Sequence, residues 1–220
     1  MRKPLEEEKP NLKAFWAIVI IVGIVIMVLV KSFLLKAYVV RNDYMADCLK
    51  NGDFVLVSVI EKVKKPVSGE VVIFEYPAER SQYRFGRIVG ISGQTIEIVN
   101  KNLYVNGELV EPPPTAKFVD PAVEDDLFSL RDNFGPYVVP QNAYFVLGDN
   151  RDRAIDSRNW GALPRKLILG KPFLVYFSWQ PDPFAPDVNS VFDVPRSIFY
   201  NVTHLLNRIG LSRIGKKVNR

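Results

Sequence analysis

The hydrophobic and polar positions divide the chain into an apolar N-terminal stretch and a series of short strand-like segments. Residues 14–30 contain no charged residue, and the apolar stretch continues past Lys31 to Leu35. A bilayer-spanning helix needs about 20 mostly apolar residues, and a lysine near its end can extend its ammonium group to the interface. The stretch is longer than the apolar core of a cleaved leader, about 7–15 residues, and no small-residue cleavage site follows it. We therefore predict a short segment over 1–13 and a transmembrane anchor over 14–35.

Beyond the anchor, short apolar segments rich in β-branched and aromatic residues alternate with turns, which is typical of strands. The predicted strands lie at 54–60, 71–74, 87–91, 95–99, 103–105, 144–147 and 173–179. Asn106-Gly107 is a strong hairpin signal. The segment 115–140 predicts loops and a weak strand, 180–195 a long loop, and 197–207 a short amphipathic helix. The strand 54–60 is nearly continuous in apolar residues and is expected to be buried.

The order of these elements predicts a mainly β fold behind the anchor. A chain of 220 residues fits one domain, or one domain with a subdomain. We expect the main domain to cover 37–220. A smaller β subdomain, at about 95–141, leaves the main sheet and returns to it.

Composition and charge narrow the function classes. The formal net charge is +5, and the basic residues are scattered except in 62–65 and 213–220. Neither basic patch has the interleaved aromatic residues of a nucleic-acid surface. We expect these patches to form a solvated face or to contact anionic lipid, and we predict no nucleic-acid partner.

The cysteine and histidine counts bear on metals and disulfides. The chain has one cysteine, Cys48, so it forms no intrachain disulfide. Its one histidine, His204, is expected to be a surface or packing residue. The usual zinc sites need more Cys and His ligands than one of each. We therefore predict no metal site and no cofactor.

The densest group of chemical side chains follows the strand at 144–147. The run from Gly148 to Arg158 contains three aspartates and three arginines. Guanidinium and carboxylate groups match in bidentate geometry, so the run predicts a network of Asp–Arg pairs that shapes the wall of a pocket. A solvated charged loop is the alternative interpretation.

This run closely resembles the last sequence block of bacterial type I signal peptidases. That family consists of membrane-anchored serine proteases that remove signal peptides from exported proteins. Further blocks resemble the family in the same order, namely 52–57, 68–77, 87–93, 159–161, Pro164 and 169–171. The resemblance implies an antiparallel β core with a smaller inserted β subdomain, behind one N-terminal transmembrane helix. It also implies a single-pass protein of the bacterial cytoplasmic membrane, with the segment 1–13 in the cytoplasm and the main domain on the outer side.

The resemblance implies changes where the family carries its catalytic groups. The family uses a serine nucleophile and a lysine general base, and these positions correspond to Tyr44 and Gly86. The serine that orients the lysine corresponds to Ala154, and the serine that helps hold the oxyanion corresponds to Asn42. A phenol ordinarily has a pKa near 10, and glycine takes no proton. The catalytic residues are therefore expected to be absent.

Other positions of the family's blocks are kept. The resemblance implies that they form the scaffold of the pocket, with Arg87 as a partner of the charged run. They are Met45, Arg87, Gly148, Asp149, Asn150, Arg151, Asp152, Asp156, Ser157 and Arg158.

These observations favour a membrane-anchored, catalytically inactive homologue of signal peptidase I. Its expected partners are the lipid bilayer, a signal peptide or preprotein, and an active signal peptidase paralogue. The family's cleft takes up an extended peptide as an added strand, which does not require a serine. The alternative is an active peptidase with a non-standard nucleophile, for which Cys48, close to Lys50, is the candidate. A third interpretation is a purely structural membrane protein that no longer binds peptides.

Overall fold

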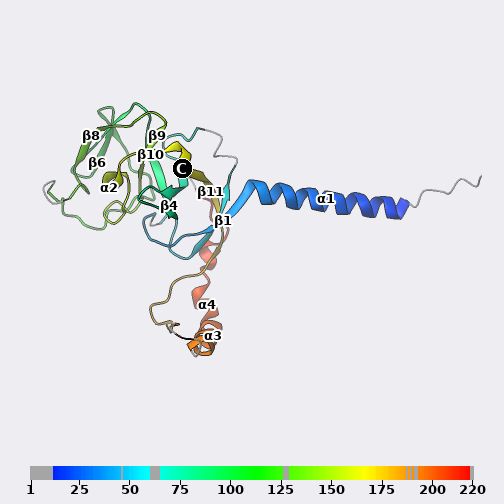
Figure 1. The fold of residues 1–220 in the computed structure, drawn as a ribbon. Coiled ribbons are helices and arrows are strands. Elements are labelled where there is room, and N and C mark those ends of the chain that lie inside the picture. The colour runs from blue at the N-terminus through cyan, green and yellow to red at the C-terminus, as the bar shows by residue number, and fades with distance from the viewer. Residues whose placement is uncertain are drawn as a thin grey trace, which may run out of the picture. The chain divides into compact units, whose positions relative to one another are not determined.

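The computed structural model describes residues 12–45, 47–59, 65–125, 129–186, 188, 190 and 193–218. The chain divides into two compact units, Met1–Leu35 and Lys36–Arg220 (Figure 1). The predicted basic patch at 62–65 lies outside the described residues apart from Lys65.

The described residues of the first unit form one helix, α1, which spans Leu12–Leu34. The side chains described in this helix from Leu12 to Val28 are exposed. The next residue, Leu35, begins a strand and ends the helix. In the described part of the chain, no helix meets the length and hydropathy expected of a membrane span.

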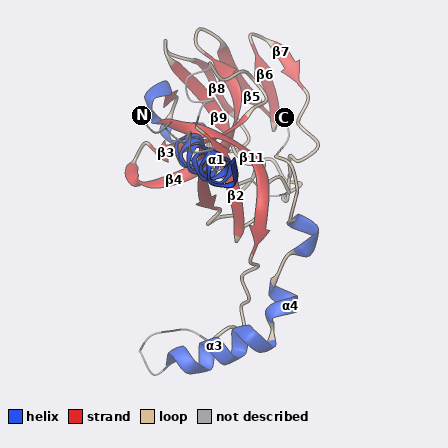
Figure 2. Ribbon diagram, turned by 90° about the vertical axis from the view of Figure 1, so that its right-hand side faces the viewer, coloured by secondary structure: helices blue, strands red, loops and turns tan. Residues whose placement is uncertain are grey.

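The second unit is built on two antiparallel sheets (Figure 2). The larger sheet has seven strands in the order β1-β2-β11-β3-β4-β9-β10. Their bounds are β1 Leu35–Val39, β2 Asp53–Ser58, β3 Val71–Tyr76, β4 Glu79–Ile91, β9 Ala143–Leu147, β10 Leu163–Pro164 and β11 Ile168–Ser178. The prediction of a mainly β, antiparallel fold is confirmed.

The smaller sheet has four strands in the order β7-β6-β5-β8. Their bounds are β5 Thr95–Val99, β6 Asn102–Val105, β7 Glu108–Val110 and β8 Phe134–Val138. Asn106-Gly107 connects β6 to β7, and both residues have positive φ, as the hairpin turn requires. All four strands fall between residues 95 and 138.

Hydrophobic side chains from both sheets form three buried clusters. One of them joins the large sheet to the loop after β1, because Met45 and Leu49 from that loop are fully buried against Val55 and Val57 of β2. Burying such side chains stabilises the fold by about 1.5–3 kcal/mol each. The loop between β1 and β2 is therefore held firmly, and this loop carries Asn42 and Tyr44.

Several strands differ from their predicted bounds. The predicted strand 87–91 is the second half of β4, which begins at Glu79 because its polar residues pair with β3. The strand β2 is not buried on both faces as expected. Its residues alternate between buried and half-buried, since an antiparallel sheet covers only one face here. β1 was not predicted.

The remaining described helices are short. α2 spans Ser157–Trp160, and the 3-10 turns η2 and η4 span Arg165–Leu167 and Leu211–Arg213. The predicted helix at 197–207 forms as two pieces, α3 Val194–Thr203 and α4 Leu205–Arg208.

Candidate functional site

A buried ion pair joins the large sheet to the charged run. Arg87 of β4 donates from Nε and Nη2 to the two carboxylate oxygens of Asp149, at 2.8 and 2.7 Å. Both side chains are almost fully buried. The hydroxyl of Thr115 donates to the same carboxylate at 2.6 Å, and Arg87 donates further to the carbonyl of Gly69 at 2.8 Å. The bidentate pair thus fixes the end of β9 against β4 and the loop at Thr115.

A second bidentate pair closes the run. Arg158 donates from Nε and Nη2 to Asp156, at 2.9 and 2.8 Å, and both residues are buried. Asp156 also caps α2 and accepts from the amide of Gly148 at 3.0 Å. Ser157 is buried and accepts from the amide of Val146 at 2.9 Å. These bonds satisfy polar groups that would otherwise be stranded in the interior.

Asp152 joins the charged run to the small sheet. It accepts from Nζ of Lys101 at 2.9 Å and from the amides of Val119 and Asp120. Burial by itself raises the pKa of Asp152, but the amide of Asp120 and the ammonium of Lys101 outweigh it and hold the pKa below its ordinary value. Asp152 is therefore charged and binds Lys101 and the segment at Val119 and Asp120 to the charged run.

Asn150 and Arg151, which lie between Asp149 and Asp152, are also buried. Asn150 donates from Nδ2 to the carbonyl of Asp43 at 3.2 Å, and its backbone amide donates to the carbonyl of Tyr44 at 2.9 Å. The guanidinium Nε of Arg151 has no hydrogen-bond partner among the described residues. Burial lowers the pKa of Arg151, although Asp149 opposes this effect.

Position 44 lies against the charged run. A Cβ atom added at Gly148 would lie 2.7 Å from the carbonyl oxygen of Tyr44 and 2.3 Å from Cβ of Ala154. Only glycine permits this approach. Asn42 accepts from the amide of Tyr44 at 3.2 Å. The structure therefore brings Tyr44, Gly148 and Ala154 together, with Asn42 supporting the loop.

Gly86 lies in β4, where it pairs with Val72 of β3. A Cβ atom added at Gly86 would lie 2.4 Å from Cγ1 of Val146, a fully buried side chain of β9. Real Cβ atoms do not approach a neighbour so closely. The space that a side chain at position 86 would need is thus occupied by Val146.

The guanidinium group of Arg84 contacts the ring at position 44. Its Cζ lies 3.4 Å from the ring centroid of Tyr76 and 5.5 Å from that of Tyr44, within the range of cation–π contacts. Arg84 also donates from Nη1 to the carbonyl of Ile155 at 3.2 Å. A permanently charged group therefore bridges β3, the loop after β1 and the charged run.

A cavity of about 400 Å³ opens beside this cluster. Its lining comes from the loop after β1 and from the first half of β4, namely Arg41, Asn42, Tyr44, Ser81, Gln82, Tyr83 and Arg84. Two of the side chains that line it are arginines. Ser81 donates its hydroxyl to Glu79 at 2.9 Å. We take this cavity as the candidate functional site.

Cys48 lies away from this cavity and inside the core. It is 3% exposed, and burial together with the carboxylate of Asp149 raises the pKa of its thiol to about 11. A reactive cysteine needs a lowered pKa and access to solvent. Cys48 has neither, so its environment is that of a core side chain.

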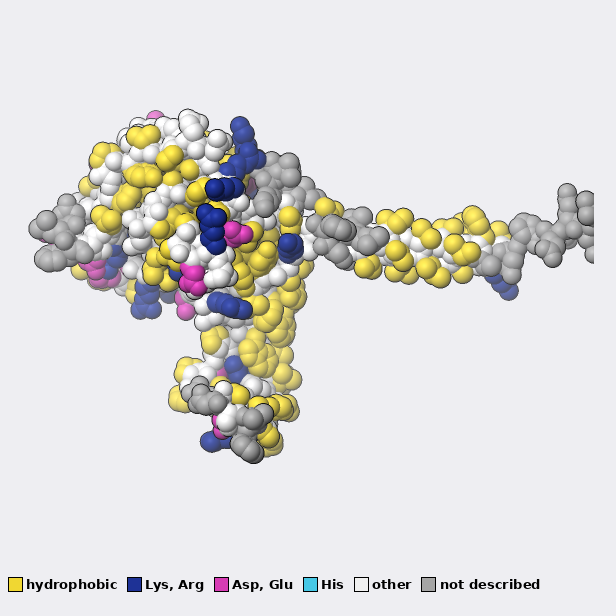
Figure 3. Space-filling view, in the orientation of Figure 1, with side chains coloured by type: hydrophobic (Ala, Val, Ile, Leu, Met, Phe, Trp, Pro, Cys, Tyr) yellow, Lys and Arg dark blue, Asp and Glu magenta, His cyan; other side chains and the backbone are white. Residues whose placement is uncertain are grey.

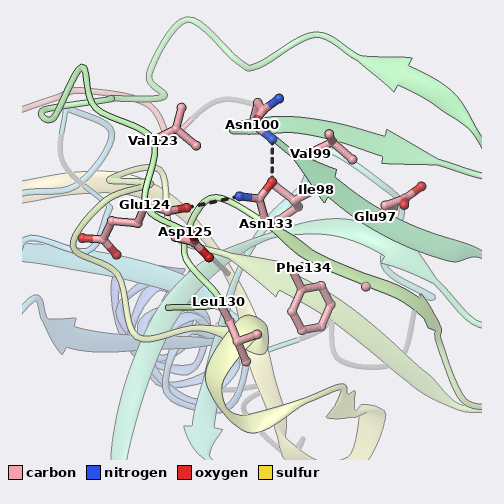
Figure 4. Close-up of a pocket in the computed structure, with 11 residues that line it drawn as sticks. Glu97, Ile98, Val99, Asn100, Val123, Glu124, Asp125, Leu130, Asn133 and Phe134 are labelled. Carbon is pink, nitrogen blue, oxygen red and sulfur yellow. Dashed lines mark hydrogen bonds between the residues drawn. The ribbon is translucent and has the colours of Figure 1, made fainter. Parts of the chain in front are cut away.

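A second cavity of about 660 Å³ lies over the small sheet (Figure 4). Asn133 crosses it, accepting from the amide of Asn100 at 2.9 Å and donating to the carbonyl of Glu124 at 3.2 Å. The other labelled side chains come from β5, from the loop before β8 and from Phe134, the first residue of β8 (Figure 4). It contains none of the residues expected from the sequence to form the site.

The sequence prediction did not include Arg84, Tyr76, Ser81 or Arg41. The segment 79–84 was not expected to be a strand, so its side chains had no predicted location. The sequence does show two tyrosines and an arginine, Tyr76, Tyr83 and Arg84, shortly before the block at 87–93, and these could have indicated a site there.

Comparisons with known proteins identify the family. A family model described as signal peptidase, peptidase S26 matches residues 12–179. Signal peptidase I S of Bacillus subtilis (strain 168) is 36% identical over 167 residues, which cover 75% of this chain and 89% of that protein. Signal peptidase I of Bacillus amyloliquefaciens is 36% identical over 180 residues, which cover 80% and 95%.

A crystal structure of a signal peptidase I from Enterococcus faecalis V583 shares 28% sequence identity, with a TM-score of 0.39 over 50% of this chain and 97% of that one. The family model and the Bacillus relatives together define the class as a signal peptidase. This chain belongs to the peptidase S26 signal peptidase family.

Proposed function

We propose that this protein binds a signal peptide or preprotein at the cavity beside Tyr44 and does not cleave it. The observation that carries the proposal is the contact of Arg84 with the ring of Tyr44. A guanidinium group is never deprotonated in proteins, so Arg84 cannot accept a proton from a nucleophile. Gly86 offers no base either, and Ala154 offers no hydroxyl to orient one.

The proposal has a structural basis in the free edge of β4. β4 pairs with β3 from Glu79 to Arg87, and it pairs with β9 only from Arg87 onward. Within the described residues, the segment Glu79–Phe85 therefore has one strand neighbour. An extended peptide can add to such an edge by main-chain hydrogen bonds. The cavity lined by Ser81 and Arg84 then takes one of its side chains.

The proposal includes the membrane arrangement that the sequence predicts. The apolar residues 14–35 anchor the chain in the bacterial cytoplasmic membrane as a single span, and the domain 37–220 lies on the outer side. The exposure of the described apolar side chains of α1 supports this, since such side chains need an apolar environment. The subdomain at about 95–141 supports the cleft through Asp152 and Lys101.

The test separates binding from cleavage. The purified full chain is reconstituted in lipid nanodiscs and mixed with a preprotein that carries a fluorescent label at its signal peptide. Binding is followed by fluorescence anisotropy, and cleavage by mass spectrometry of the same samples. We expect saturable binding and an intact preprotein.

Two matched variants locate the binding site. Ser81→Trp fills the cavity and is expected to weaken binding at least tenfold. Arg80→Trp puts the same side chain on the neighbouring residue, which does not line the cavity, and is expected to leave binding unchanged. Equal effects of the two variants, or no binding by the wild type, would reject the site.

Two other outcomes reject the proposal in favour of its alternatives. Site-specific cleavage that disappears with Cys48→Ala would assign the chemistry to the cysteine. Preprotein binding that requires an added, active signal peptidase would make that enzyme the direct partner. Burial and the raised pKa of Cys48 disfavour its thiolate, and they therefore disfavour cleavage by this residue.

A further inference from the structure

Helices α3 and α4 have a half-buried polar side and an exposed apolar side. Helices of soluble proteins ordinarily turn the apolar stripe to the core. Here no residue of either helix is buried. The half-buried positions are polar or carry a polar tip, and they recur every three to four residues, as one helix face requires. They are Ser197, Tyr200, Asn201 and Arg208, and the N-cap residues Asp193 and His204 are half-buried as well.

These polar side chains hold the helices to the rest of the domain. Tyr200 donates its hydroxyl to Asp182 at 2.8 Å. Arg208 donates to Asn201 and to the carbonyl of Gln180, and its guanidinium lies 4.7 Å from the ring centroid of Trp179. The helices are therefore fixed to the end of β11 in one orientation, which determines the side that faces outward.

The outward side is hydrophobic. Six of its side chains form what we call the apolar face, and each is exposed, with Phe199 at 72% and Leu206 at 80%. The face consists of Val194, Ile198, Phe199, Val202, Leu205 and Leu206. Figure 3 shows hydrophobic side chains gathered along this C-terminal segment. A contiguous exposed patch of this kind marks a surface that contacts another apolar phase.

Charge around the apolar face identifies that phase. Residues 194–218 contain five arginines and lysines and no aspartate or glutamate. Arg213 is paired with the buried Asp53, and Arg208 is held by Asn201 and Gln180. The charges of Arg196, Lys216 and Lys217 are left to act on the surroundings. An amphipathic helix with large apolar side chains and a basic C-terminal flank is typical of helices that lie in the surface of an anionic bilayer.

We propose that the apolar face of α3 and α4 lies in the surface of a bilayer that contains anionic lipid. This gives the main domain its own membrane contact, separate from α1 and beyond the peptide-binding function proposed above. The family model ends at residue 179, so this contact comes from a part of the chain outside the matched region. The contact sets the orientation of the domain relative to the lipid.

Spin labels on the full chain test the proposal. Phe199→Cys and Leu206→Cys receive a nitroxide, while Cys48 stays unlabelled because it is buried. Glu108→Cys, an exposed residue of the hairpin between β6 and β7, is the control. The labelled proteins are placed in nanodiscs of phosphatidylcholine and phosphatidylglycerol. Collisions with oxygen, which concentrates in lipid, are compared with collisions with a water-soluble nickel chelate.

We expect oxygen collisions to dominate at Phe199 and Leu206, and nickel collisions to dominate at Glu108. Nanodiscs of phosphatidylcholine alone should shift both helix labels towards nickel. Nickel-dominated collisions at the two helix positions in the anionic nanodiscs would overturn the proposal. Low collision rates with both reagents would also overturn it, because they indicate contact with protein, such as a second copy of this chain.

Carbonate extraction separates this proposal from the anchor. Chains that resist extraction but have water-exposed labels at Phe199 keep the α1 anchor and reject the α3 contact. Chains that carbonate releases, but whose labels collide with oxygen before extraction, reject the anchor and keep the contact.

Discussion

The buried pair of Arg87 and Asp149 allows a stability change to be calculated from the structure. Asp149→Asn keeps the shape of the side chain and removes its charge. Arg87 then remains buried with an uncompensated charge, and its bonds to Gly69 and Thr115 do not replace the carboxylate. Breaking a buried pair by removing one partner costs about 3–5 kcal/mol.

This cost translates into a large shift of the melting temperature. For a domain of 150–250 residues, 1 kcal/mol corresponds to about 2–4 °C. Asp149→Asn should therefore lower the melting temperature by roughly 6–20 °C. The measurement is circular dichroism of the full chain in detergent, with urea unfolding as a second probe. Glu108→Gln, an exposed carboxylate, is the control and should leave the midpoint unchanged.

A double variant tests the physical reason for the loss. Arg87→Met together with Asp149→Leu replaces both charges by apolar groups of similar size. It should recover most of the stability that Asp149→Asn loses, because the uncompensated charge is gone. A melting temperature of Asp149→Asn equal to wild type would refute the reasoning. A double variant as unstable as the single one would show that hydrogen bonds, and not charge, dominate.

Three further predictions follow from neighbouring residues. The pKa of Asp152 is lowered, so its contribution to stability is present above about pH 4 and is lost as the pH falls through the folded-state pKa. The urea midpoints of wild type and Asp152→Asn should therefore converge as the pH is lowered. Gly86→Ala should cost about 1–3 kcal/mol through overpacking, and Val146→Ala in the same chain should restore part of it in urea titrations. Cys48 should resist iodoacetamide at pH 8 in the native protein and react after unfolding in urea, as followed by mass spectrometry; rapid native alkylation would contradict its burial.

The sequence predicted the strands whose apolar residues face the core, and it missed those whose position depends on a neighbour. β5 and β9 match their predicted ranges closely, because Ile96, Ile98 and Phe145 are buried and give a clear pattern. The first half of β4 is polar and forms a strand only because β3 lies beside it. Cross-strand pairing of that kind leaves no periodic signal in the sequence.

The same distinction applies to the candidate site. Alternating charges in the run after β9 indicated Asp–Arg pairs, and the chain forms two bidentate pairs there, at Asp149 and Asp156. The contact of Arg84 with Tyr44 and Tyr76 joins three separate segments and depends on the folded structure. Which cation lies beside position 44 was therefore outside the reach of sequence patterns.

The close fit between Gly86 and Val146 has a consequence for how this protein can change over generations. A single mutation that places any side chain at position 86 meets Cγ1 of Val146 at 2.4 Å, so its first effect is loss of stability. Val146 must become smaller before a lysine is tolerated there, and that step alone leaves a cavity in the core. Whichever of the two substitutions comes first, at position 86 or at position 146, the protein with that single change is less stable. A lineage that carries this pair is thus separated from a lysine at position 86 by more than one substitution.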